Sequence, residues 1–356
     1  MIGYHFDPPE YKPLNWAILL TWLVSMGTSS CGTGKLWLSR AKMRIFVIGG
    51  TGFIGRRLVR RLAARGHTVT CMDANPNAHS FADLGQKVFA LRGDVARFED
   101  VIGAMTAAEP ERVVNLAYLI GSQHGPHMAM RINILGMDNC FEAARSLGVK
   151  HTVYAGSFAP YGKQSNYGER AVTEADPTYG EYQYARHKII NEWQALDYIE
   201  KFGMCITGIR VAYVTGPDKM RGSVDHVRCI TEPARGNAIT LPFKDVMVCA
   251  IHVDDIAEVF ARVLMADKPA HHIYNSGGTS ISLGELANIV LSYLPDAQIS
   301  FQNERGAKDC NATYLLDNSR LLSEFGIQHR PIRESILQII NDTRRDVGLP
   351  LIGQPH

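Results

Sequence analysis

The sequence lacks the features that mark membrane-spanning and nucleic-acid-binding proteins. Its 37 basic and 35 acidic residues leave a net charge of only +2, so no strong field gathers nucleic acid or coats an anionic membrane. The apolar stretch at residues 16–26 is shorter than the roughly 20 residues that cross a bilayer. We therefore expect neither nucleic acid nor a membrane as a partner.

Cysteine and metal-ligand patterns are also missing. The seven cysteines are odd in number and scattered, and no two of them form a CxxC pair. This distribution favours reduced, mostly buried thiols and a cytoplasmic location. The adjacent His271 and His272 have no Cys or carboxylate partner at ligand spacing, so we expect no metal site.

What the sequence does contain is a glycine-rich turn between an expected strand and an expected helix. The run MRIFVIGGTGFIG, residues 43–55, begins with an apolar strand, and apolar residues at helical spacing follow it. Glycines at such a turn let backbone N–H groups and the helix N-terminus approach a pyrophosphate closely. The predicted dinucleotide-binding residues of this turn are Gly49, Gly52, Phe53, Ile54 and Gly55.

An acidic residue favours NAD as the dinucleotide. The next expected strand, residues 68–72, leads directly to Asp73. This carboxylate lies near the roughly 20-residue offset of the group that accepts from the adenosine ribose hydroxyls. An acid at this place repels a 2′-phosphate and so favours NAD over NADP, although Arg56 and Arg57 nearby soften the preference.

Strands and helices alternate along most of the chain. Strand patterns at residues 87–91, 112–117, 151–155 and 205–211 are separated by helical patterns at 97–108, 126–147 and 184–202. Alternation on this scale predicts right-handed βαβ units, and hence an α/β fold with a Rossmann-type, doubly wound parallel sheet.

The later part of the chain is less regular, which predicts a second lobe. We expect residues 43–217 to form the NAD-binding Rossmann domain, with 250–280 returning to it. Residues 218–249 and 281–350 then form a smaller, discontinuous substrate lobe, and a ligand lies between the lobes.

Residues 1–42 do not fit this pattern. Lys12 precedes the apolar stretch and small residues follow it, as in a signal peptide or N-terminal anchor. Export is unusual for a nucleotide-dependent enzyme, so we favour a non-native or disordered extension that ends where Met43 provides a natural start.

Further cofactor contacts are expected after the third and fourth strands. Asp94 and Val95 follow the third strand, where Asp94 is a candidate for the adenine amino group or, alternatively, a cap for the following helix. The fourth strand runs into the crevice beside the nicotinamide half of the cofactor, where we place Leu116 and Ala117.

The candidate catalytic residues are Ser157, Tyr184 and Lys188. The last two are four apart on an expected helix and so share a face. A tyrosine with a pKa of about 10 becomes a base near neutral pH only if its phenolate is stabilised by about 3 units. A nearby lysine typically supplies roughly 1 to 3 units, and the oxidised nicotinamide supplies the rest. Ser157 would hold the substrate alcohol in line.

Taken together, these motifs closely resemble those of the extended short-chain dehydrogenase/reductase family, which contains nucleotide-sugar epimerases and dehydratases. The resemblance covers residues 43–331 and rests on the glycine turn, Asp73, Asp94-Val95, NLA at 115–117, Asn133, VYAGSFAPYG at 153–162, YARHK at 184–188, IRVAYVTGP at 209–217 and HVDDIA at 252–257. It implies catalytic roles for Ser157, Tyr184 and Lys188, and a cofactor-binding or supporting role for Asn133. It also implies a homodimer packed through helices near 126–147 and 184–202.

The departures from the family pattern bear on the reaction. Dehydratases of the family carry an acidic pair after the catalytic hydroxyl, whereas Phe158 and Ala159 follow Ser157 here, so dehydration is disfavoured. Epimerases of the family usually have an asparagine at the position of Tyr213 and a diphosphate-binding arginine at the position of Val248. A diphosphate needs such donors, for which Lys219, Arg221 or Arg305 are the available substitutes.

These features predict an NAD-dependent oxidoreductase or epimerase that acts on a secondary alcohol of a sugar or nucleotide-sugar-like substrate. The alternative is a simple dehydrogenase or reductase of a small polyol, sugar acid or other hydroxy compound. A third class, a non-catalytic NAD-sensing protein, is opposed by the intact Ser157, Tyr184 and Lys188, because a pure binder needs no matched base.

Overall fold

The structure is a computed structural model that describes residues 42–76, 78–120, 124–306 and 312–353. The expectations for the N-terminal extension therefore lie outside the described residues, apart from Lys42. In the described ranges, no helix combines the length and apolar character that crossing a membrane requires.

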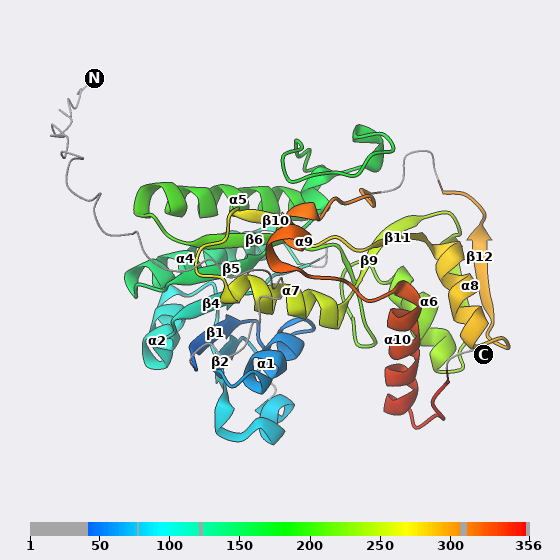
Figure 1. Ribbon diagram of the computed structural model, residues 1–356, viewed down its shortest axis with the longest axis horizontal. Helices are drawn as coiled ribbons and strands as arrows, with labels where there is room; N and C mark the ends of the chain where they lie inside the picture. The colour runs from blue at the N-terminus through cyan, green and yellow to red at the C-terminus, as the bar shows by residue number, and fades with distance from the viewer. Residues whose placement is uncertain (1–41, 77, 121–123, 307–311, 354–356) are drawn as a thin grey trace, which may run out of the picture. The chain divides into compact units, whose positions relative to one another are not determined.

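The centre of the fold is a parallel sheet of seven strands, as the alternating pattern predicts (Figure 1). Its order is β10-β6-β5-β4-β1-β2-β3. The strands are β1 (Arg44–Ile48), β2 (Thr68–Asp73), β3 (Val88–Arg92), β4 (Arg112–Asn115), β5 (His151–Ala155), β6 (Ile206–Arg210) and β10 (Ile273–Asn275). In register, Ile48 pairs with Met72 on one side and Asn115 on the other, so the strands end together at one edge.

Helices cover both faces of this sheet, because successive side chains of each strand point to opposite faces. Ile45 and Val47 pack with α1 (Gly55–Ala64) and α7 (Val253–Met265). Phe46 and Ile48 pack instead with α2 (Phe98–Ala108) and α4 (Gly136–Ser146). The two buried faces explain why β1 is almost continuously apolar in sequence.

The expected helix at 126–147 is continuous but not regular. It runs from α3 (Pro126–Met130) through a π-helical turn at Arg131–Leu135 into α4. The expected helix at 184–202 is α5 (Gln183–Phe202). The structure adds a kinked pair of 3₁₀ turns at Ala78–Lys87, which the sequence analysis did not anticipate.

A second group of elements surrounds its own apolar core. Strands β7 (Tyr213–Thr215), β9 (Met247–His252) and β11 (Thr279–Ser282) form a three-stranded sheet in the order β11-β9-β7. Strands β8 (Ile239–Phe243) and β12 (Ile299–Asn303) pair in parallel. The helices of this group are α6 (Asp225–Ala234), α8 (Leu283–Tyr293) and α10 (Ile332–Asp346).

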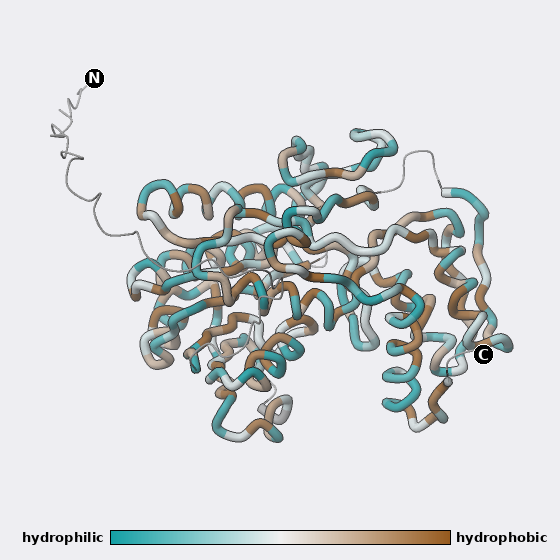
Figure 2. Tube along the Cα trace, in the orientation of Figure 1, coloured by the Kyte–Doolittle hydropathy of each residue, from teal (hydrophilic) through white to brown (hydrophobic). Residues whose placement is uncertain are grey.

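The two groups of elements alternate along the later part of the chain. Within 250–280, α7 and β10 belong to the core of the large sheet, whereas β9 pairs with β7 and β11. Helix α9 (Ser319–Phe325) also packs into the core of the large sheet through Leu321 and Phe325. Figure 2 shows brown and teal alternating along outer helices such as α10, the pattern of a helix with one buried face.

Candidate active site

A pocket of about 870 Å³ lies at the edge where the parallel strands end. The first residues after β1, β4, β5 and β6 all line it, namely Gly49, Leu116, Gly156 and Val211. Ligands of open α/β sheets bind outside the carboxyl ends of the strands. The pocket therefore lies where this architecture places a dinucleotide and its substrate.

The glycine turn at one end of the pocket has no room for side chains. Gly49 has φ +77°, and a Cβ there would lie 2.9 Å from the Ala117 nitrogen. A Cβ on Gly55 would lie 2.1 Å from the Gly49 carbonyl oxygen. Helix α1 begins here without a side-chain cap or an acidic residue in its first turn. This bare helix N-terminus fits the pyrophosphate of a dinucleotide.

Asp73 lies at the end of β2 and accepts a hydrogen bond from the Thr51 hydroxyl at 2.7 Å. The two arginines that could favour NADP are engaged elsewhere. Arg57 binds Asp218 through both terminal nitrogens, at 2.9 and 3.3 Å, and Arg56 also pairs with Asp218. With both arginines paired to Asp218, the expected preference for NAD over NADP depends on Asp73.

Asp73 and four other predicted cofactor residues, Asp94, Val95, Ala117 and Asn133, lie outside the pocket lining. The Asp94 carboxylate accepts from the Ala96 N–H at 2.9 Å, and α2 has no side-chain cap, so the capping alternative does not apply. Val95 is a core residue against Gly136. The buried Asn133 carboxamide accepts from the Leu119 N–H at 2.8 Å and donates to its carbonyl at 3.1 Å. Asn133 thus supports the loop after β4.

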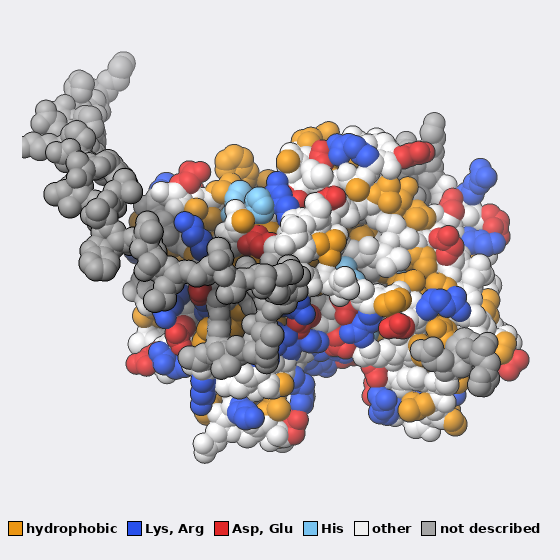
Figure 3. Space-filling model, in the orientation of Figure 1, with side chains coloured by type: hydrophobic (Ala, Val, Ile, Leu, Met, Phe, Trp, Pro, Cys, Tyr) orange, Lys and Arg blue, Asp and Glu red, His pale blue; other side chains and the backbone are white. Residues whose placement is uncertain are grey.

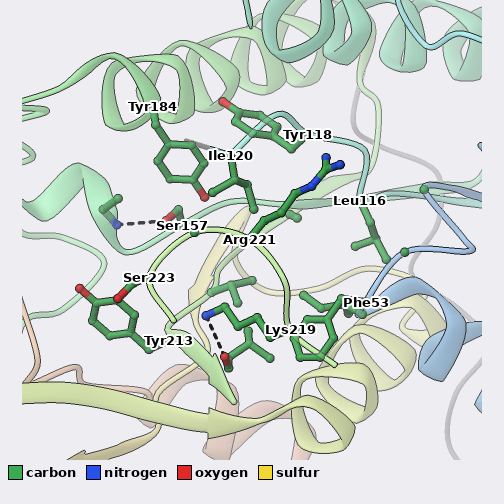
Figure 4. Close-up of a pocket in the computed structure, with 18 of the residues that line it drawn as sticks. Phe53, Leu116, Tyr118, Ile120, Ser157, Tyr184, Tyr213, Lys219, Arg221 and Ser223 are labelled. Carbon is green, nitrogen blue, oxygen red and sulfur yellow. Dashed lines mark hydrogen bonds between the residues drawn. The ribbon is translucent and has the colours of Figure 1, made fainter. Parts of the chain in front are cut away.

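Ser157, Tyr184 and Lys188 all line the pocket. Figure 4 shows the Tyr184 hydroxyl directed toward Ser157. Ser157 follows β5, and its Oγ accepts from the Ala159 N–H at 3.1 Å. Tyr184 and Lys188 lie one turn apart in α5, and the Lys188 ammonium donates to the Ala155 carbonyl at 2.5 Å. The structure thus brings together the three side chains that the sequence marks as catalytic.

The electrostatics of this group differ from the expectation. Burial raises the pKa of Tyr184 to about 12, and the hydrogen bond with Ser157 opposes the increase. Burial also holds the pKa of Lys188 well below its ordinary value. The Lys188 ammonium lies 5.6 Å from the centre of the Tyr184 ring. In the protein alone, the nearby lysine therefore does not bring the pKa of Tyr184 below its ordinary value.

Tyr118 is a pocket residue that the sequence analysis missed. Its ring centre lies 3.2 Å from the Lys188 ammonium, and its edge meets Tyr184 with ring centres 5.4 Å apart. Its hydroxyl is buried without a hydrogen-bond partner among the described residues. The only local signal is an aromatic residue directly after the NLA run, and nothing in the sequence shows that it reaches α5.

Aromatic side chains line part of the pocket. Phe158 and Tyr213 pack with ring centres 4.8 Å apart, and Tyr182 stacks on Tyr184 at 6.2 Å. Lys219 lies near Tyr213, and the Arg221 guanidinium lies between Tyr118 and Leu116 (Figure 4), whereas Arg305 is not among the lining residues. Within the ranges that the structure describes, no group of three His, Cys, Asp or Glu side chains could hold a metal ion.

Comparisons with known proteins agree with this geometry. A family model described as the NAD dependent epimerase/dehydratase family matches residues 45–277. A UDP-glucose 4-epimerase of Mycolicibacterium smegmatis is 29% identical over 232 residues, which are 62% of this chain and 72% of that protein. Cinnamoyl-CoA reductase 1 of Oryza sativa subsp. japonica is 24% identical over 336 residues, or 87% of this chain and 93% of the reductase.

A solved structure extends the match over most of the chain. The UDP-glucose 4-epimerase of Thermus thermophilus, solved in complex with NAD, superposes with a TM-score of 0.74 and 26% identity. The match covers 85% of this chain and 99% of that protein.

Proposed function

Because the chain belongs to the NAD-dependent epimerase/dehydratase family, we propose that it oxidises a secondary alcohol of a sugar-like substrate at Ser157, Tyr184 and Lys188. One observation carries this proposal: the Tyr184 hydroxyl is directed at Ser157 inside the pocket that the glycine turn also lines (Figure 4). A pocket that only stored a dinucleotide would not need a base and a hydroxyl facing one another beside it.

The roles of the three residues follow from their positions. Ser157 orients the substrate hydroxyl, and Tyr184 takes its proton. The glycine turn would hold NAD, which would supply the acceptor for the hydride of the same carbon. The Tyr184 pKa of about 12 has to fall by several units for this transfer near neutral pH. Lys188 contributes a positive charge on the same helix face, one turn from Tyr184.

Two outcomes of the oxidation fit this site. An epimerase returns the hydride to the other face of the ketone, whereas a dehydrogenase releases the oxidised product. Dehydration has no support in the pocket, because Phe158 and Ala159 line it directly after Ser157 and carry no group that moves a proton. Net NADH accumulation with substrate separates the dehydrogenase from the epimerase.

The surface of α3 to α5 supports a homodimer. Large apolar side chains are exposed along these helices, and Trp193, at 67% exposure, is the most prominent. The others are Met128, Met130, Leu135, Ile190 and Phe202. Burying such a stripe against a second copy removes it from water.

Two further features bear on the setting in which the protein acts. Basic and acidic side chains are interspersed over the face shown in Figure 3, in keeping with small-molecule chemistry. The five cysteines that the structure describes are free thiols, which suits the cytoplasmic location that we propose.

The replacement Tyr184→Phe tests the proposal. It removes the proton acceptor and keeps the ring, so turnover should be abolished while the Kd for NAD stays within about twofold. Isothermal titration and a substrate panel of sugars, sugar acids and nucleotide sugars measure the two quantities. A comparable loss of NAD affinity and turnover would mean that Tyr184 holds the cofactor site together and is not the base.

A further inference from the structure

Two backbone segments that lie side by side form the wall of the pocket next to Ser157. Residues 155–159 run from the end of β5, residues 211–214 follow β6, and both segments line the pocket. The Phe158 N–H donates to the Val211 carbonyl at 3.2 Å, which joins the two segments. The side chains of this wall are therefore fixed beside the serine that orients the reacting alcohol.

This wall offers few hydrogen bonds to a substrate. Within residues 155–159 and 211–214, only Ser157 and Tyr213 have a polar atom in their side chains. Ser157 serves the reacting hydroxyl, so the Tyr213 hydroxyl is left for every other polar group that meets the wall. The other amide and serine of the described lining, Gln183 and Ser223, are exposed and stay hydrated.

The rings of Phe158 and Tyr213, whose centres lie 4.8 Å apart, are held in place from behind. Phe158 is only 7% exposed, and Tyr161 and Tyr167 pack with it in one buried cluster. Tyr213 packs against the same cluster. Burial raises the pKa of Tyr213 to about 12, so its hydroxyl is uncharged near pH 7. The wall is thus ordered and neutral before any ligand arrives.

An ordered apolar wall is complementary to an apolar group of a ligand. A methyl group or an aromatic ring that packs on Phe158 and Tyr213 removes apolar surface of both partners from water. A hydroxyl in the same place loses its water and has at most the Tyr213 hydroxyl as a new partner, so its desolvation opposes binding. Because the rings neighbour Ser157, this selection acts on the part of the substrate close to the reacting carbon.

We propose that Phe158 and Tyr213 make the pocket specific for secondary alcohols that carry an apolar group, methyl or aryl, close to the hydroxyl that Tyr184 deprotonates. This inference rests on the proposed function and narrows its substrates from fully hydroxylated sugars to compounds with such an apolar face. Phe158 and Tyr213 act by contact alone, so they determine specificity and carry no proton.

The test measures binding of two matched pairs of probes to the NAD-loaded protein by titration calorimetry. D-Fucose carries a methyl group where D-galactose carries a hydroxymethyl group, and 1-phenylethane-1,2-diol carries a phenyl group where glycerol carries a hydroxymethyl group. We expect the apolar member of at least one pair to bind about 10-fold more tightly than its polar partner, the scale of a hydroxyl buried without a hydrogen bond. The pair that shows the difference identifies the apolar group as methyl or aryl.

Variants of the wall test whether the two rings cause the preference. Phe158→Ser and Tyr213→Asn each replace a ring by a polar side chain, so the ratio of the two affinities in a pair should fall toward 1. Phe158 is buried and its replacement also weakens the core, whereas Tyr213 is partly exposed, so Tyr213→Asn keeps the test independent of folding. Phe89→Ser removes an exposed ring of β3 that is not part of the pocket lining and should leave both ratios unchanged.

The replacement Tyr184→Phe separates this inference from the proposed function. The variant should bind the four probes in the same order as the parent protein while it loses turnover. Loss of turnover together with equal binding of both members of each pair would overturn the apolar specificity and leave the proposed function standing. A preference that persists in both Phe158→Ser and Tyr213→Asn, or binding of none of the four probes, would also overturn it. Retained turnover with the preference intact would instead refute Tyr184 as the base.

Discussion

The Lys188 ammonium lies 3.2 Å from the centre of the Tyr118 ring, so the loop after β4 supplies a π face to the buried lysine of α5. A cation over an aromatic face is stabilised by about 2 kcal/mol or more when it is desolvated. This contact, with the hydrogen bond to the Ala155 carbonyl, opposes the burial that lowers the Lys188 pKa. Tyr118 therefore helps keep the ammonium charged beside Tyr184.

Replacing Tyr118 should shift the pH dependence of the reaction. Tyr118→Leu removes the π face, Lys188 loses its proton more readily, and the Tyr184 phenolate loses a cation. The rising limb of the plot of kcat/KM against pH should shift to higher pH by about 1 unit. Tyr118→Phe keeps the ring and discards only the hydroxyl, which has no partner among the described residues, so its profile should match that of the parent enzyme.

The same pair of variants separates electrostatics from packing. If Tyr118→Leu lowers the rate equally at every pH, the ring acts only by filling space. A profile that moves with Tyr118→Phe would instead place the hydroxyl in the chemistry.

The sequence predicts the parts of this site that local patterns encode. The glycine turn and the alternating elements depend on residues close in the chain, so the strand, turn and helix from Arg44 to Ala64 follow directly from them. Ser157, Tyr184 and Lys188 could be predicted to share a site because they lie in motifs that resemble those of the family, and all three line the pocket. The direction of the Tyr184 pKa shift could not, because it arises from burial, and Tyr118, which packs against Tyr184, comes from the distant loop after β4.

Other features depend on tertiary contacts alone. Sequence motifs assign Asn133 to the cofactor or its support, and only the structure shows that its carboxamide bonds to Leu119, fourteen residues earlier. The low pKa of Lys219 arises from a fold that encloses it against β7 and α6, and no residue beside it in sequence implies this.

Lys219→Met should change stability in a pH-dependent way. The folded pKa of Lys219 is about 7 and its ordinary value is 10.5, so between these values the unfolded chain binds the proton that the folded chain has released. The parent protein therefore gains stability as pH rises from 7 toward 10. The variant lacks this group, so its Tm should exceed that of the parent by about 2–4 °C at pH 6, with a smaller excess at pH 9.5.

Thermal denaturation at four or five pH values measures this difference, and Lys201→Met serves as the exposed control. A Tm excess that stays constant with pH would show that Lys219 does not titrate in this range.

Gly55→Ala should disable the cofactor turn. The added Cβ would lie 2.1 Å from the Gly49 carbonyl oxygen, so the backbone has to shift where the pyrophosphate fits. We expect the free energy of unfolding to fall by about 2 kcal/mol and NAD binding to be lost. Gly103→Ala is the matched control, because that glycine lies inside α2 with open space around it and should gain about 0.5–1 kcal/mol. Urea unfolding and NAD titration measure the two effects. Normal NAD binding by Gly55→Ala would show that the turn tolerates a side chain at this position.

Asp218→Asn should relax the preference for NAD over NADP. Asp218 binds both Arg56 and Arg57, and removing its charge frees the Arg56 guanidinium beside the glycine turn, whereas Arg57 keeps its ion pair with Asp254. A released arginine can accommodate a 2′-phosphate, so the NADP-to-NAD affinity ratio should rise several-fold, the scale of a partly exposed ion pair of about 1 kcal/mol. Asp73 remains, so NAD should stay the better ligand.

Asp83→Asn breaks a comparable surface pair with Arg60 and should leave the ratio unchanged. An unchanged ratio in Asp218→Asn as well would mean that neither arginine reaches the adenosine ribose and that Asp73 alone sets the preference.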